Sequence, residues 1–325
     1  MCTAITLCHN DNHYFGRNLD LEYHYHETVT VTPRRFVFEF RNGRRMNTHF
    51  ALIGMATVAD GYPLYYEATN EKGLSLAGLN FPRNAVYYPP DHKRDDIAPF
   101  ELIPWILGQC ATVDEALALL KHTNLWDTPF SDAFPLSPLH WLLADRTRSV
   151  TLEPLVDGLK LHDNPVGVLT NNPPFDYHLH HLAHYLNLTP AQPVNRFSTA
   201  ITLEPYSLGM GAIGLPGDLS SASRFVRATF VKLNSVGGDS EEQQVARFFH
   251  ILGSVAQQNG LNRVRDDAFE YTVYSSCCNT VKGVYYYTTY ENSRISAVDM
   301  HREDLDDNTL YTYPLITDPQ IRYQN

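Results

Sequence analysis

The sequence predicts an α+β fold built as a single domain. Strand patterns with alternating apolar residues fill the first 80 residues, helical patterns dominate the middle of the chain, and strand patterns return near its end. Such segregated runs are typical of α+β proteins, whereas regular alternation of strands and helices would indicate parallel βαβ units. No repeat, low-complexity tract or linker divides the chain, so we expect one domain over residues 1–325, with Met1 removed in the mature protein.

The N-terminal strands are separated by residues that favour turns. The segments His9 to Asn12, Asn42-Gly43 and Asn70 to Gly73 provide this turn chemistry, so the pattern predicts antiparallel pairing. The expected strands are Ile5 to Leu7, Tyr14 to Leu19, Thr28 to Thr32, Phe36 to Phe40, Leu64 to Ala68 and Leu74 to Gly78.

Helix signals follow in the middle of the chain. Pro99 suits the first turn of a helix over Phe100 to Gln109, and Thr112 with Glu115 forms a capping-box pattern before a helix over Val113 to Lys121. Later helices are expected at Tyr177 to Leu188, Ser221 to Asn234 and Glu241 to Gln257. The remaining expected strands are Leu139 to Asp145, Ser149 to Glu153, Leu159 to His162, Val166 to Thr170, Tyr271 to Ser276, Val284 to Tyr290, Ile295 to Asp299 and Leu310 to Pro314.

Composition narrows the range of partners and locations. The hydrophobic content of 43% in 325 residues suits a large core, and the net charge of -11 without a basic cluster argues against nucleic acid or an anionic membrane surface as partner. No apolar stretch is long enough to span a membrane, and the N-terminus lacks signal-peptide features. Five cysteines, with Cys277 and Cys278 adjacent, indicate reduced thiols. We therefore expect a cytoplasmic protein.

Cys2 is the most informative residue. Removal of Met1 would leave one residue holding both a thiol and a free α-amino group. An α-amino group titrates near pH ~8, so it can accept the thiol proton without a separate histidine. This arrangement predicts amide hydrolysis by an N-terminal nucleophile. Position alone leaves a second interpretation open, in which Cys2 is a small buried residue at the start of an edge strand.

The expected first hairpin brings two charged residues toward Cys2. If Asn10-Asp11 centres a two-residue turn, Cys2 faces Leu19 and Arg17 lies diagonally across on the same side of the sheet. A permanent cation there would stabilise a thiolate. In a regular strand the side chain of Asp20 points to the opposite face of the sheet from that of Arg17. Asp20 therefore needs a bulge or the end of the strand to reach Cys2 and hold a protonated amine. The alternative for this pair of charges is a surface ion pair.

Four separated segments carry a resemblance to a known family. They are Phe15 to Asp20, Asn70 to Leu74 with Ala77 to Pro82, Leu169 to Pro173, and Gly214 to Phe225. Together with Cys2 they resemble the choloylglycine hydrolase family, most closely its bacterial bile salt hydrolases, and the resemblance extends to the strand containing Tyr285 to Tyr287.

This resemblance implies the αββα sandwich of N-terminal nucleophile hydrolases, with no cofactor and no metal, and a homo-oligomer, specifically a tetramer. It implies hydrolysis of the amide bond of glycine- or taurine-conjugated bile salts. Penicillin V acylases look alike at the catalytic positions and remain an alternative, as does a noncatalytic binder of amphipathic ligands.

The resemblance also implies roles for individual residues. Cys2 would be the nucleophile and its α-amino group the base. Arg17 and Arg224 would flank the thiol, and Asp20 would hold the amine. The side-chain amide of Asn171 and the backbone N–H of Asn80 would stabilise the oxyanion, at about 3 kcal/mol for each such donor. Without the resemblance, the position of both asparagines at the ends of expected strands predicts only that they form turns.

Aromatic and apolar residues mark a candidate substrate mouth. Tyr23 and Tyr25 alternate with polar residues just after Asp20, so a loop there could line the mouth, although a strand with one aromatic face fits equally well. The candidate substrate-binding residues are Tyr23, Tyr25, Phe81, Phe130, Phe134 and Leu136.

Three other patterns argue for structure rather than function. His180 and His184, spaced i and i+4 in a helix that also holds His178 and His181, could bind zinc, but an apolar stripe leaves most of these histidines on the solvated side. That stripe is Leu179, Leu182, Ala183 and Leu186. Gly209 to Gly214 matches G-x-G-x-x-G in letters only, because a proline follows where a helix should continue. Cys277 and Cys278 are too close for a C-x-x-C motif, so we expect them in the core.

Overall fold

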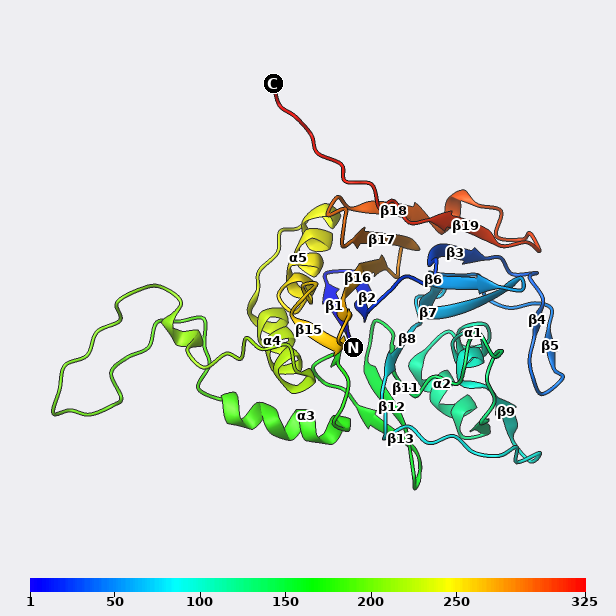
Figure 1. Ribbon diagram of the computed structural model, residues 1–325, viewed down its shortest axis with the longest axis horizontal. Helices are drawn as coiled ribbons and strands as arrows, with labels where there is room; N and C mark the ends of the chain where they lie inside the picture. Colours follow the sequence, from blue (N-terminus) through cyan, green and yellow to red (C-terminus); the bar gives the residue numbers. More distant parts are fainter.

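The computed structural model describes residues 1–325 and consists of four layers. Two β-sheets pack face to face, and helices cover both outer faces (Figure 1). Helices α4 (Ser221–Asn234) and α5 (Glu241–Gly253) cover one sheet, and α3 (Phe175–Leu182) packs against α4. Helices α1 (Leu102–Leu107) and α2 (Val113–Leu120) cover the other. The predicted α+β class and αββα sandwich are confirmed.

The first sheet holds the N-terminal strand. Its order is β14-β1-β2-β16-β17-β18, and β15 pairs with β16 beside this path. The N-terminal hairpin therefore lies between strands that come from distant parts of the chain. The strands are β1 (Cys2–His9), β2 (Asn12–Leu21), β14 (Val168–Leu169), β15 (Asn262–Arg265), β16 (Ala268–Asn279), β17 (Val284–Thr289) and β18 (Ser296–Asp299).

The second sheet has eight strands in the order β13-β12-β11-β8-β7-β6-β3-β19. Two small pairs lie outside it, namely β4 (Phe38–Glu39) with β5 (Arg45–Met46) and β9 (Asp95–Ile97) with β10 (Thr123–Leu125). The eight strands are β3 (Thr28–Thr32), β6 (Leu52–Ala59), β7 (Tyr62–Asn70), β8 (Ser75–Asn80), β11 (Leu139–Ala144), β12 (Ser149–Leu155), β13 (Gly158–Asp163) and β19 (Tyr311–Pro314).

Two apolar cores hold the layers together. The first contains side chains from both sheets and from α4 and α5, among them Ile5, Val29 and Phe225. The second lies between the second sheet and helices α1 and α2, and includes Leu76 and Trp105. The second sheet is thus apolar on both faces, since each face packs against another layer.

The sequence did not predict the short strands β5, β9, β10 and β15 or the long strand β6, and burial on both faces explains why β6 was missed. In β6 every residue from Leu52 to Thr57 is buried, so the alternating pattern that marks a half-exposed strand is absent. The expected strand Phe36 to Phe40 contracts to Phe38–Glu39, because its only partner is the short β5. The expected strand Val166 to Thr170 contracts to Val168–Leu169 at the edge of its sheet.

The helices also depart from their expected bounds. The predicted helix from Phe100 to Gln109 is a 3₁₀ turn, Pro99–Glu101, followed by the shorter α1. Helix α3 ends at Leu182, so the expected apolar stripe does not continue, and Leu186 is 86% exposed. His178 is buried, whereas His180 and His184 lie on the exposed side.

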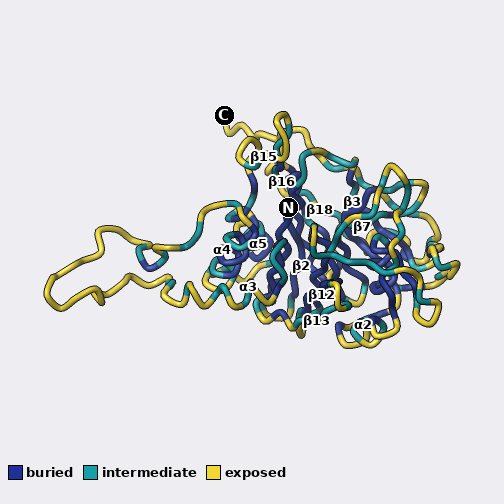
Figure 2. Tube along the Cα trace, turned by 60° about the horizontal axis from the view of Figure 1, so that its bottom comes forward, coloured by how far each residue is buried: buried dark blue, intermediate teal, exposed yellow.

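A long arm projects from the body of the protein between α3 and α4 (Figures 1 and 2). Two 3₁₀ turns lie between these helices: Ala183–Tyr185 directly after α3, and Met210–Ala212, which contains part of the G-x-G-x-x-G match. No helix opens directly from this match, as a nucleotide-binding loop would require. The arm carries strongly exposed apolar side chains, namely Val194, Phe197, Ile201, Leu203, Tyr206 and Leu208.

None of the helices combines the length and the apolar character needed to cross a membrane.

Candidate active site

The first hairpin sets the position of Cys2. Strands β1 and β2 pair around Asn10-Asp11, and the register places Cys2 opposite Leu19 and Ala4 opposite Arg17. The predicted hairpin geometry is therefore confirmed, because Cys2 and Arg17 lie on the same face. Asn10 adopts a positive φ of 51°, which asparagine tolerates in a tight turn. Cys2 itself is only 3% exposed.

Arg17 extends from the first sheet to the second. Its Nη1 donates to the backbone carbonyls of Gly78 at 2.5 Å and Tyr66 at 3.1 Å. Burial lowers the pKa of Arg17, but the charge and hydrogen bond of the neighbouring Cys2 thiol raise it above its ordinary value. Arg17 is thus a buried, permanent cation beside the sulfur.

Glu67 lies behind Arg17 and was not singled out from the sequence. Its carboxylate is 3.8 Å from Nε of Arg17 and accepts hydrogen bonds from Tyr274 at 2.8 Å, Tyr285 at 2.5 Å and Ser276 at 2.9 Å. Burial raises the pKa of Glu67, and the Arg17 charge opposes this shift. A lone carboxylate within the strand segment Tyr65 to Thr69 was the signal that could have identified it.

Asn171 connects three of the predicted residues. Its Oδ1 accepts the backbone N–H of Cys2 at 2.8 Å and a hydrogen bond from Arg224 at 2.8 Å. Its Nδ2 donates to the carbonyl of Asn80 at 2.7 Å. The pairing of Ala4 with Leu169 brings this segment to the edge of β1. One of the two amide N–H bonds of Asn171 therefore remains available.

Arg224, in the first turn of α4, also contacts the side chain of Asn171. The side chain of Ser220 caps this helix by accepting the N–H of Ser223, which fixes where the helix begins. Nη1 of Arg224 donates to the carbonyl of Cys2 at 2.6 Å and to the hydroxyl of Thr3 at 2.6 Å. Burial lowers the pKa of Arg224, while the charges of Asp20 and Cys2 oppose this.

Asp20 is fully buried where β2 meets an irregularity in its partner strand. The pairing of β2 with β16 shifts register between Thr272 and Tyr274, directly opposite Asp20. The Asp20 carboxylate accepts hydrogen bonds from Thr272 at 2.7 Å and from Gln257 at 2.8 Å. These two partners hold the carboxylate while Met1 is present.

Met1 extends β1 by one residue along Asp20. Its amino group donates to the carbonyl of Asp20 at 2.8 Å, and the N–H of Asp20 donates to the Met1 carbonyl at 3.0 Å. The amino group also contacts Glu270. Burial lowers the pKa of this amino group. With Met1 in place, the nitrogen of Cys2 is an amide and cannot accept a proton.

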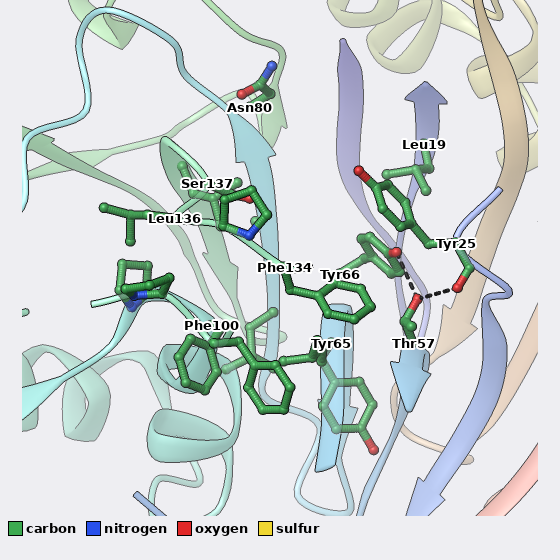
Figure 3. Close-up of a pocket in the computed structure, with 18 of the residues that line it drawn as sticks. Leu19, Tyr25, Thr57, Tyr65, Tyr66, Asn80, Phe100, Phe134, Leu136 and Ser137 are labelled. Carbon is green, nitrogen blue, oxygen red and sulfur yellow. Dashed lines mark hydrogen bonds between the residues drawn. The ribbon is translucent and has the colours of Figure 1, made fainter. Parts of the chain in front are cut away.

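A cavity of about 310 Å³ opens beside Cys2 (Figure 3). This volume lies at the lower end of the range for small-molecule pockets. Cys2, Arg17 and Asn80 line the cavity, together with aromatic and apolar side chains from β2, β7 and the segment 128–137. The other residues of its wall include Leu19, Leu21, Tyr65, Tyr66, Phe100, Ile103, Pro129, Pro135, Leu139 and Trp141.

The candidate substrate-binding residues divide into two groups. Tyr25, Phe130, Phe134 and Leu136 line the cavity. Tyr23 and Phe81 lie outside it. The ring of Tyr23 packs on Tyr25 from the exposed side, with 4.8 Å between the centroids, while Phe81 is buried and stacks on His140 at 4.2 Å.

Two buried histidines support the strand end that carries Asn171. Nε2 of His140 lies 3.0 Å from the carbonyl of Thr170, and its Nδ1 lies 3.1 Å from the carboxylate of Glu153. Nε2 of His178 donates to the carbonyl of Asn171 at 2.9 Å. Burial lowers the pKa of His178 to about 4. The structure shows no cluster of three or more His, Cys, Asp or Glu side chains arranged to hold a metal ion.

The geometry brings a thiol, two buried cations and two amide groups to one end of an apolar cavity. Cations stabilise a thiolate, and amide N–H groups stabilise the oxyanion that forms when a nucleophile adds to a carbonyl. The arrangement can therefore carry out nucleophilic acyl transfer.

Comparison with known proteins agrees with this chemistry. The model of the choloylglycine hydrolase family, linear amide C–N hydrolases, matches residues 2–313. The chain is 53% identical to the bile salt hydrolase/transferase of Lactiplantibacillus plantarum over 98% of each chain, and 38% identical to that of Clostridium perfringens over 96% of each. A solved variant of conjugated bile acid hydrolase from Clostridium perfringens superposes with a TM-score of 0.92 at 37% identity, covering 100% of both chains.

Proposed function

The chain belongs to the choloylglycine hydrolase family of linear amide C–N hydrolases, and from that premise we propose that it hydrolyses the amide bond of glycine- or taurine-conjugated bile salts. The products are the free bile acid and the amino acid. The observation that carries the proposal is the position of Cys2 and Arg17 in the wall of a mainly apolar cavity.

The first half of the reaction forms a thioester. The freed α-amino group of Cys2 takes the thiol proton, and the thiolate attacks the amide carbon, so that the carbonyl oxygen becomes an oxyanion. The remaining N–H of Asn171 and the backbone N–H of Asn80 donate to that oxygen. The C–N bond then breaks, and glycine or taurine leaves as an amine after taking the proton from the α-ammonium group.

The second half uses water. The neutral α-amino group takes a proton from a water molecule, whose oxygen attacks the thioester carbon. The C–S bond breaks, the bile acid leaves as a carboxylic acid, and the Cys2 thiolate is restored. Arg17 and Arg224 stabilise this thiolate, while Asp20 holds the ammonium group once Met1 has been removed.

The mainly apolar lining of the cavity suits a steroid. A steroid offers a rigid apolar body, and its burial contributes about 25 cal/mol per Å² toward binding. Rings such as Phe100, Phe130 and Phe134 provide an apolar surface in the same cavity that Cys2 lines. Binding of the steroid would hold the amide in position for attack by Cys2.

We further propose a cytoplasmic homo-oligomer, a tetramer as the resemblance implies. All five cysteines are free, as is usual in a reducing compartment. The exposed apolar side chains of the arm support self-association, because a second copy could cover them.

The proposal is tested with the purified, Met1-free protein and a panel of glyco-conjugated bile salts, tauro-conjugated bile salts and penicillin V. We expect kcat/KM for at least one bile salt to exceed that for penicillin V. A higher value for penicillin V than for every conjugate would replace the bile-salt assignment with an acylase. An absence of any turnover would favour the noncatalytic binder.

A further inference from the structure

A pair of hydroxyl groups interrupts the apolar wall of the cavity. Thr57 on β6 and Tyr66 on β7 both line it, and their side-chain oxygens are 2.9 Å apart. Thr57 also lies 3.1 Å from the carbonyl of Tyr25 in the mouth segment. Figure 3 shows both contacts within the group of side chains that forms the pocket.

The protons of this pair can be assigned from the contacts. A backbone carbonyl can only accept, so Thr57 donates its one hydroxyl proton to Tyr25. Thr57 must then accept the hydrogen bond that joins it to Tyr66, and Tyr66 is the donor. Both hydroxyl protons are therefore committed within the protein. The Tyr66 oxygen keeps an unused lone pair and presents an acceptor without a donor.

We propose that this acceptor recognises a hydroxyl group on the apolar body of the acyl substrate, so that Thr57 and Tyr66 determine a preference for hydroxylated steroids. The inference rests on the proposed function and adds to it a feature of the substrate. If the wall had no acceptor, a substrate hydroxyl buried against it would lose its hydrogen bond to water without replacement, and this loss would disfavour binding. A group that can only accept, such as the ether oxygen of a phenoxyacetyl side chain, gains nothing there.

Substitution of Tyr66 tests the proposed hydroxyl recognition more directly than substitution of Thr57. Tyr66→Phe removes the acceptor and preserves the ring, the Thr57–Tyr25 contact and the backbone carbonyl that holds Arg17. Thr57→Ser keeps the hydroxyl and serves as the matched control. Thr57→Val is less informative because it also releases the mouth segment.

The experiment measures kcat/KM for two glycine conjugates, one of the trihydroxylated cholic acid and one of the unhydroxylated cholanic acid. The ratio of the two values should fall about three- to tenfold in Tyr66→Phe, as expected for one neutral hydrogen bond. It should stay at the parent value in Thr57→Ser. Conjugates that lack a single hydroxyl then identify which one is recognised, since that conjugate alone loses its response to Tyr66→Phe.

An unchanged ratio in Tyr66→Phe would overturn the inference, whether both kcat/KM values stay at the parent level or fall by the same factor. Either result leaves the proposed function standing, because the parent still hydrolyses conjugates. If the parent hydrolyses no conjugate, the proposed function itself fails, so the two failures are distinguishable.

Discussion

The backbone nitrogen of Cys2 donates a hydrogen bond to Oδ1 of Asn171, 2.8 Å away. This nitrogen becomes the α-amino group when Met1 is removed. Arg224 donates to the same oxygen, so the amide of Asn171 is fixed with its Nδ2 toward Asn80. One contact therefore links the proposed base with the proposed oxyanion donors, and it leads to the first prediction.

Any residue that precedes Cys2 should inactivate the enzyme, because it converts the proposed base into an amide. We expect at least a ~100-fold loss of kcat when Met1 or a tag remnant is retained, in line with the contribution of general-base catalysis. Intact mass and activity should be measured before and after proteolytic release of a tag that ends directly before Cys2. Full activity in the uncleaved protein would contradict the mechanism.

Substitution of the nucleophile should remove turnover and keep the fold. Cys2→Ala loses the thiol with little loss of packing, and Cys2→Ser should also be severely impaired, since a hydroxyl is much harder to deprotonate. Circular dichroism and turnover should be compared with Cys8→Ser, which changes an exposed thiol. Activity of Cys2→Ala within tenfold of the parent would disprove the assignment.

Loss of either flanking cation should make the thiol less reactive. In Arg17→Ala and Arg224→Ala, the rate of Cys2 labelling by iodoacetamide at neutral pH should fall about tenfold, because a positive charge that stabilises the thiolate has been removed. Arg227→Ala is the matched control on α4, since that side chain donates to the carbonyl of Ser254. A labelling rate that stays constant or rises would show that the charges do not act on the sulfur.

Acid should destabilise the protein through His178. Its pKa is about 4 in the folded protein and about 6.5 when unfolded, because protonation would bury a charge on Nδ1, which has no partner. Between these values the unfolded chain binds more protons, so the free energy of unfolding falls as pH falls, by at most ~1.4 kcal/mol per pH unit.

Urea titrations between pH 7 and pH 4.5 measure this slope. It should be shallower in His178→Gln, which retains a donor for the Asn171 carbonyl but does not titrate. The exposed His184→Gln serves as control and should keep the parent slope. His13, whose pKa burial also lowers to about 4, accounts for part of the remaining slope. Identical slopes in all three proteins would refute the role of His178.

The arm should mediate self-association. Phe197 and Tyr206 are each 84% exposed, so Phe197→Asp and Tyr206→Asp should shift the oligomer toward monomer without unfolding the body. Analytical ultracentrifugation measures this shift. Val236→Asp, at a site 93% exposed but outside the arm, should have no effect. An oligomer of unchanged size in both arm variants would exclude the arm as the contact.

Local patterns were sufficient for much of the fold. Asn10-Asp11 predicted the hairpin register that places Arg17 beside Cys2, because a two-residue turn leaves only one pairing. The predicted helix Ser221 to Asn234 agrees with α4 at both ends, and this helix positions Arg224. The positions of Cys2, Arg17 and Arg224 on these elements could be predicted because short-range geometry determines them.

Long-range packing could not be predicted in the same way. Strand β6 is buried on both faces, so its sequence lacks the alternation of apolar and polar residues that marks a half-exposed strand. Glu67 meets Tyr274 and Tyr285 only when the two sheets face each other. Phe81 resembled a mouth residue in the sequence but packs on His140 behind the cavity. These contacts join segments that are far apart in the chain.

The placement of β2 between β1 and β16 affects how the chain can mature. The free edge of β2 has no partner until Ala268–Asn279 has left the ribosome, so the sheet that holds Cys2 closes only near the end of translation. Pairing over such sequence separations slows folding. Because trimming of Met1 requires only an emerging N-terminus, it can precede this closure, before Glu270 and Asp20 enclose the amino group. Under the proposed mechanism, a molecule that folds with Met1 still attached would enclose a blocked amine and stay inactive.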